Sequence, residues 1–327
     1  MRYLRVLPFK KLFRGVIGVK NFFILPILIS KDQVGGQAVL EGVMLRGKQN
    51  WVIAVRKPNQ EIVIEKRKIN SIAKKLPLLK VPLLRGIAAV IEMVVLGMQA
   101  ISLSAELTME DEDVKISGKE MAVSIGLALI FGAFLFIILP SWITVLIDKQ
   151  LSNVFAVSFF EGFLRLGIFL LYLIVISRIK DIKRVFEYHG AEHKVIHAFE
   201  AEDELTPQAA SKYSPLHVGC GTAFILIAFT ILILVFALLG RPPLIWRIIS
   251  RLLVAPLVIG ISYEIIKFAR KRKDSSFVKV LLAPGLWLQK LTTREPSLEQ
   301  LEVAISSLKS LLPLENFENE SEACILQ

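Results

Sequence analysis

The sequence is poor in cysteine and in histidine. The 327-residue chain contains two cysteines, Cys220 and Cys324, which lie more than a hundred residues apart, and only four histidines. Two cysteines so widely separated provide no disulfide framework, so we expect a protein of a reducing compartment. The interleaving of basic and aromatic residues that is typical of RNA-binding proteins is also missing. Nucleic acid is therefore not an expected partner.

Apolar residues and basic charge are what the chain has in excess. Hydrophobic residues make up 54% of the sequence, and 40 Lys and Arg against 29 Asp and Glu give a formal net charge of +11. The mean hydropathy of +0.58 is high for a soluble globular protein. Long apolar runs with basic flanks are typical of proteins that reside in a bilayer. We therefore expect a mainly α, multi-pass protein of the cytoplasmic (inner) membrane, with the lipid bilayer and other membrane proteins as its partners.

Four apolar stretches are each close to the twenty residues that a spanning helix needs. They are residues 121–147, 154–177, 222–239 and 244–268. Glu161 and Arg165, within the second stretch, are spaced i,i+4 and are expected to pair. Intramembrane ionisable residues of this kind mark either a functional site or a structural salt bridge between helices.

The distribution of Lys and Arg predicts the orientation of these stretches. Basic residues concentrate in the segments 1–120, 178–221 and 269–327, which the positive-inside rule places in the cytoplasm together with both termini. A further apolar stretch, 86–107, would reverse this orientation if it crossed the membrane. We therefore expect an in-plane or re-entrant helix within residues 86–120.

The remaining segments predict smaller units around a membrane domain of residues 121–268. Residues 1–33 form a basic and apolar N-terminal segment. Residues 34–85 contain glycine-punctuated and β-rich runs with turn chemistry between them, which predict a small cytoplasmic β-containing region that is polar enough to lie in water. Residues 269–327 are expected to form a cytoplasmic tail that includes an amphipathic helix.

The chemistry-bearing residues gather in the cytoplasmic loop 178–221. All four histidines lie between His189 and His217, and Cys220 follows three residues later. The string HGAEH at 189–193 is H-x-x-E-H, the inverted zincin order. In a helix, His189 and His193 lie on one face, where they can bind a metal, and Glu192 is placed to take a proton from water.

Four motifs together resemble the YqhQ-like family of bacterial membrane proteins. They are GGQAVLEGVMLRG at 35–47, YHGAEHK at 188–194, CGT at 220–222 and LTTREP at 291–296. The family is described as predicted metal-dependent enzymes of unknown function. The resemblance implies a membrane protein whose site residues are His189, Glu192, His193, His217 and Cys220.

Two functions of different classes follow from this pattern. In the first, the protein is a membrane-bound zinc hydrolase, for example a peptidase, at the cytoplasmic face. Two histidines and a third ligand, for which His217, Cys220 and Glu200 compete, hold Zn²⁺, and Glu192 is the general base. In the second, the metal site is structural and the protein is a scaffold, assembly factor or transporter component. The number of protein ligands separates them, because a closed four-ligand site of His189, His193, His217 and Cys220 has no open position.

Overall fold

The computed structural model describes residues 34–71, 79, 81–109, 118–147, 153–239, 242–272 and 275–325. The basic and apolar segment expected at residues 1–33 lies outside this part of the chain. The described part is mainly helical, as expected, with a small N-terminal sheet and four long apolar helices.

The predicted β element is a four-stranded antiparallel sheet in the order β1-β2-β3-β4. Its strands are β1 (Gly35–Val39), β2 (Gly42–Arg46), β3 (Asn50–Arg56) and β4 (Ile62–Lys68). Val43 pairs with Ala54 and Leu45 with Val52. The turn between β1 and β2 contains Glu41 in the left-handed region, with φ of 52°. This conformation reverses the chain tightly and brings the first two glycine-rich strands side by side.

Both faces of β2 and β3 are covered by helices. On one face, Val43, Leu45 and Val52 pack with α6 (Lys180–Glu200) and α11 (Leu298–Ile325). On the other face, Met44, Trp51 and Ile53 pack with α2 (Leu84–Thr108). Successive side chains of each strand therefore point into two different apolar cores, instead of alternately into one core and into water. Most residues of β4 are exposed or partly exposed, whereas the two central strands are buried. That this β element lies in water stays a prediction.

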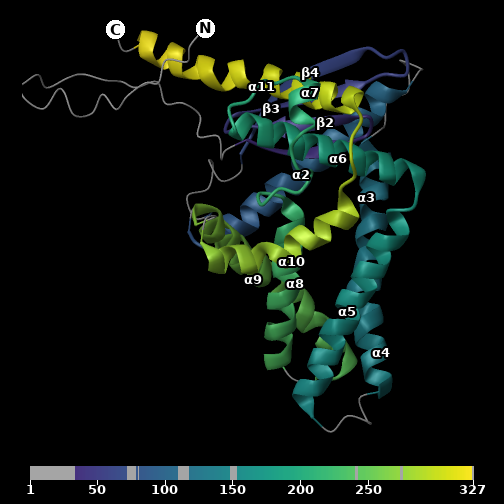
Figure 1. The fold of residues 1–327 in the computed structure, drawn as a ribbon. Helices are drawn as coiled ribbons and strands as arrows, with labels where there is room; N and C mark the ends of the chain where they lie inside the picture. The colour runs from purple at the N-terminus through teal and green to yellow at the C-terminus, as the bar shows by residue number, and fades with distance from the viewer. Residues whose placement is uncertain are drawn as a thin grey trace, which may run out of the picture.

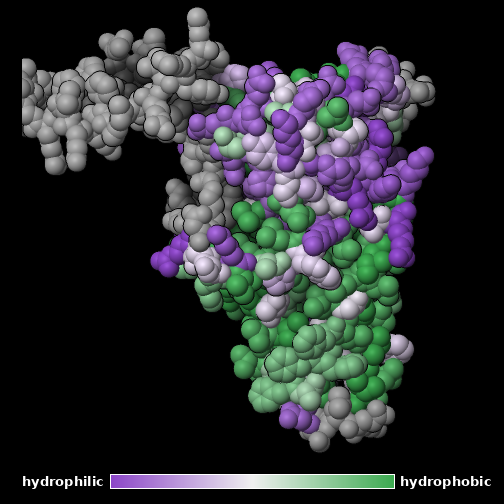
Figure 2. All heavy atoms as spheres, in the orientation of Figure 1, coloured by the Kyte–Doolittle hydropathy of each residue, from purple (hydrophilic) through white to green (hydrophobic). Residues whose placement is uncertain are grey.

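A helical region extends away from the sheet on one side. It includes α3 (Gly118–Ala133), η4 (Phe134–Ile138), α4 (Leu139–Ile147), α5 (Val154–Ile176), α8 (Gly221–Leu238) and α9 (Leu244–Lys271). Figure 1 shows α4, α5 and α8 running away from the sheet, and Figure 2 shows that this end of the molecule is covered by apolar residues while the sheet end is polar. The separation of an apolar helical end from a polar sheet end indicates membrane association.

Four helices in the described part of the chain are long and apolar enough to cross a membrane. They are Leu84–Thr108, Ala122–Ile147, Phe155–Ile176 and Leu244–Ala269, and Phe224–Leu238 is a shorter apolar helix. Three of the four stretches predicted from the sequence, 121–147, 154–177 and 244–268, are in this set. The fourth, 222–239, corresponds to the shorter helix. The set instead includes α2, whose Leu96, Ala100 and Leu103 pack on the sheet. Its opposite face, with Ile91 and Val94, is exposed and apolar. One face of α2 thus packs on the sheet and the other is free to contact lipid, which agrees with a helix in the membrane plane. The in-plane placement stays a prediction.

A buried polar network connects the apolar helices. The predicted pair is present, since Arg165 Nη2 lies 2.8 Å from Glu161 Oε1, and Arg251 of α9 lies 3.4 Å from the same carboxylate. Pro140 has no N–H for the carbonyl of Phe136, and the helix forms a π-helical turn just before it. The Arg165 Nε donates to that carbonyl over 2.7 Å. The network thus joins α5, α9 and the π-helical turn.

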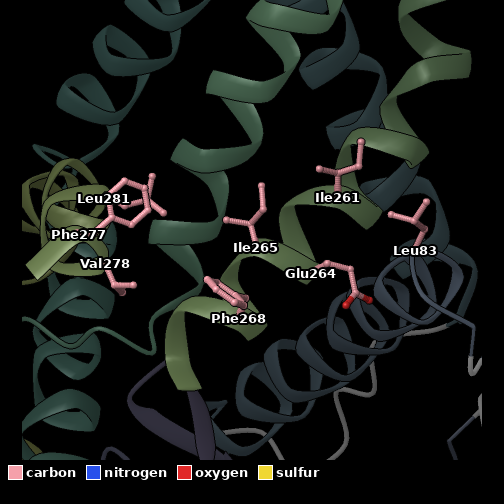
Figure 3. A pocket seen from close by; sticks show the side chains of 8 residues that line it. All are labelled: Leu83, Ile261, Glu264, Ile265, Phe268, Phe277, Val278 and Leu281. Carbon is pink, nitrogen blue, oxygen red and sulfur yellow. The ribbon is translucent and has the colours of Figure 1, made fainter. Parts of the chain in front are cut away.

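The helix α10 (Ser276–Thr292) lies between the sheet end and the apolar helices (Figure 1). Val278, Leu282 and Leu288 are buried, whereas Phe277 and Trp287 are largely exposed. Its first turns border an apolar pocket of about 470 Å³ between α9 and Leu83, with Glu264 at its edge (Figure 3). That pocket lies apart from the histidines, which contact the other end of α10.

Candidate metal centre

His189 and His193, which were predicted to share a helical face, do so on α6. His189, His193 and His197 stand four residues apart in a helix that is continuous from Lys180 to Glu200. The ring centroids of His189 and His193 lie 4.4 Å apart. His193 is almost fully buried, and burial lowers its pKa, which keeps the imidazole in the neutral form that binds metals. The sequence of α6 therefore positions two of the donors, His189 and His193, without help from distant segments.

Cys220 completes this group from the other side. It is the N-cap of α8, and its Sγ accepts from the Thr222 N–H over 3.4 Å. The Sγ lies 3.3 Å from His189 Nε2. One donor atom from each of His189, His193 and Cys220 falls within 4.8 Å of the others. Because a helix N-terminus interacts favourably with negative charge, the position suits a thiolate ligand.

Backbone carbonyls fix both histidine rings in the orientation that a metal ligand requires. His189 Nδ1 lies 2.8 Å from the carbonyl of Thr292, and His193 Nδ1 lies 2.6 Å from the carbonyl of Pro215. A carbonyl only accepts, so each Nδ1 carries the proton and donates it. Each Nε2 then presents a lone pair towards Cys220. This is the arrangement in which a second group holds a ligating histidine in one tautomer.

Glu192 is buried beside the three donors. Its Oε2 lies 3.5 Å from His193 Nε2, and its side chain packs against Gly36 of β1, where an added Cβ would approach Glu192 Oε1 to 2.8 Å. Burial raises the pKa of the Glu192 carboxyl, and the neighbouring His189 and His217 act in the opposite direction. A carboxyl in such surroundings is suited to accept a proton.

His217 lies in a neighbouring group rather than with Cys220. Its Nε2 is 3.4 Å from Glu200 Oε1, and its ring centroid is 4.6 Å from that of His197. His197, Glu200 and His217 form a second set of donor atoms within 4.8 Å of one another. Of the proposed third ligands, the structure therefore brings Cys220 to His189 and His193. Glu200 and His217 lie instead beside His197, at the C-terminal end of α6.

Segments remote in the sequence hold the site in place. The chain at 293–296 crosses α6 so closely that a Cβ on Gly190 would lie 2.0 Å from the carbonyl oxygen of Arg294. The glycine within the histidine motif is thus required for this crossing. Gln289 of α10 brackets His217 with two 2.9 Å hydrogen bonds, one to its N–H and one to its carbonyl. Thr292 belongs to the LTTREP motif, but no sequence pattern pointed to Gln289 or Pro215.

Fold and site together define a membrane-associated helical protein with a candidate His/Cys metal centre beside a small sheet. The chain belongs to the family described as a protein of unknown function (DUF1385), which matches residues 81–314. It is 38% identical over 301 residues to the uncharacterized protein YqhQ of Bacillus subtilis (strain 168), covering 88% of this chain and 95% of that protein. No solved structure matches the chain. The family expected from the motifs is confirmed, and its descriptions state neither a metal nor an activity.

Proposed function

We propose that the protein is a membrane-bound, metal-dependent hydrolase whose centre faces the cytoplasm. His189, His193 and Cys220 hold the metal, and the donor set of two imidazoles and a thiolate suits Zn²⁺. When bound, the metal supplies Lewis-acid activation of water and polarises the scissile group.

One observation carries this proposal. Two histidine Nε2 atoms with their Nδ1 protons committed to backbone carbonyls converge on one cysteine sulfur, and a buried carboxyl lies 3.5 Å from His193 Nε2. Three protein ligands leave one position of a tetrahedral zinc site for a small molecule, which is the arrangement of catalytic rather than structural sites. Glu192 then takes the proton from water and delivers it to the leaving group.

The alternative is a structural site in a scaffold or transporter component. It requires a fourth protein ligand, and His217 was the candidate. His217 Nδ1 accepts from the Gly219 N–H over 3.1 Å, and its Nε2 points to Glu200. The geometry therefore favours the three-ligand site.

The test compares variants of the full-length protein purified in detergent. We expect Glu192→Gln to keep the metal content of the unmutated protein and to lose hydrolysis of fluorogenic ester and peptide substrates by 10²-fold or more, since a general base contributes about 10²–10⁴ in rate. His193→Ala is expected to lose both metal and hydrolysis. A Glu192→Gln protein with full metal and full activity refutes the catalytic role.

A further inference from the structure

We propose that His197, Glu200 and His217 hold a second divalent transition-metal ion next to the first, so that the centre binds two metals. This inference rests on the proposed function, because the second ion serves the same site. It assigns His197 a role that the histidine motif alone did not indicate, and it places Glu200 in a second site instead of in the first.

The three donors converge in the same way as those of the first group. A nitrogen of each histidine and an oxygen of Glu200 lie within 4.8 Å of one another. His197 Nε2 lies 2.9 Å from the carbonyl of Leu216, so it carries the proton and leaves the lone pair on Nδ1. Two imidazoles and a carboxylate are ligands that zinc, manganese and iron ions share in proteins.

An unsatisfied buried nitrogen points to a ligand in this group. His217 is nine-tenths buried, and its Nε2 has no hydrogen-bond partner among the described residues. Glu200 Oε1 is 3.4 Å away, near enough for attraction but without hydrogen-bond geometry. A nitrogen and an oxygen at this spacing can both reach one ion at about 2.0–2.2 Å each, and His197 supplies the third donor of this group.

The two groups are adjacent. The rings of His193 and His217 are 5.7 Å apart between centroids. The Glu192 carboxyl is influenced by His189 of the first group and by His217 of the second. The Glu192 carboxyl therefore interacts electrostatically with both sets of donors without belonging to either.

One hydrogen bond is expected to make the second ion bind more weakly than the first. The Gly219 N–H donates to His217 Nδ1 over 3.1 Å, whereas an imidazole that binds a metal through Nε2 carries its proton on Nδ1. Binding at Nε2 must displace this hydrogen bond, which lowers the affinity of the second site by roughly tenfold. His189 and His193 have no such competing donor, since both Nδ1 atoms already donate to carbonyls.

The test is a zinc titration of the full-length protein, freed of any purification tag and stripped with a chelator, against a competing zinc dye. We expect two equivalents per chain, the second about tenfold weaker. Glu200→Gln and His217→Ala should each remove only the weaker equivalent, and His193→Ala should remove the tighter one. Glu200→Gln serves as the conservative variant, because Glu200 is partly exposed and its replacement preserves shape.

The outcomes distinguish this inference from the proposed function. A single equivalent that Glu200→Gln and His217→Ala leave unchanged overturns the second site and keeps the first. Two equivalents, both insensitive to these variants, also overturn it, because the second ion then binds elsewhere. No bound zinc at all overturns the proposed function together with the inference.

Discussion

At the scale of single residues, the candidate centre depends on how the histidines are held as much as on which residues they are. His189 takes its orientation from the carbonyl of Thr292, and the chain that follows Thr292 contacts α6 at Gly190. The Arg294 N–H also donates to the Phe186 carbonyl over 2.9 Å, one turn before the glycine. Gly190 therefore determines whether the segment that orients His189 can approach.

Replacing Gly190 by Ala tests this dependence. The new Cβ would lie 2.0 Å from the Arg294 carbonyl oxygen, which is backbone and cannot rotate away. We expect the crossing segment to shift, the hydrogen bond from His189 to be lost, and metal affinity to fall about 10–100-fold. Gly167→Ala is the matched control, because nothing lies within 4 Å of its added Cβ in a helix. Equal metal affinity of both variants, measured by dye competition, contradicts this role for Gly190.

The sequence allowed part of this centre to be predicted, for a local reason. The spacing of His189 and His193 indicates a shared helical face, and Glu192 follows from the same motif. The partition of Cys220 and His217 into different groups depends on the path of the loop before α8. Contacts such as that of Lys194 Nζ with the Ser211 carbonyl, 2.7 Å apart, guide this path. Long-range contacts of this kind leave no periodic pattern to read.

At the scale of elements, the apolar helices are joined by charge as well as by packing. Glu161 accepts from Arg165 and from Ser141, and Arg251 stacks on the Phe236 ring with 4.5 Å to its centroid. The predicted i,i+4 pair is confirmed, but its partners on α4 and α9 were not foreseeable from spacing. Likewise, a β-rich run does not show that helices cover both its faces.

Removing Arg165 should destabilise the helical region. Arg165→Gln leaves the carboxyl of Glu161 with weaker compensation and removes the donor to the Phe136 carbonyl. Breaking a buried pair costs about 3–5 kcal/mol, so we expect the midpoint of thermal unfolding in detergent to fall by roughly 6–15 °C. Arg178→Gln, at an exposed arginine just beyond α5, is the control and should change the midpoint by less than about 2 °C. An unchanged midpoint in Arg165→Gln contradicts a stabilising role of the network.

At the scale of the whole molecule, the polar sheet end and the apolar helices suggest one orientation in the membrane (Figure 2). The sheet, α6 and α11 pack into one core, so they lie on the same side of the bilayer. The basic segments predict that this side is the cytoplasmic one, with the histidine centre and both termini on it.

Labelling of single introduced cysteines tests this topology. In a chain with Cys220 and Cys324 replaced by serine, we expect Lys149→Cys to react with a membrane-impermeant maleimide in intact cells. Glu202→Cys, at an exposed position after α6, should react only after the membrane is made permeable. Reaction of position 202 in intact cells contradicts the predicted orientation.

The central claim is that His189, His193 and Cys220 bind one metal ion together. The most direct measurement is the absorption spectrum of the full-length protein after metal removal and addition of one equivalent of Co²⁺, which occupies zinc sites and reports its ligands. We expect a thiolate-to-cobalt charge-transfer band and the intense visible bands of a four-coordinate ion. Cys220→Ser should abolish the charge-transfer band, and His189→Ala should weaken binding and change the visible bands. A spectrum of six-coordinate cobalt, or one that Cys220→Ser leaves unchanged, contradicts a shared site of these three residues.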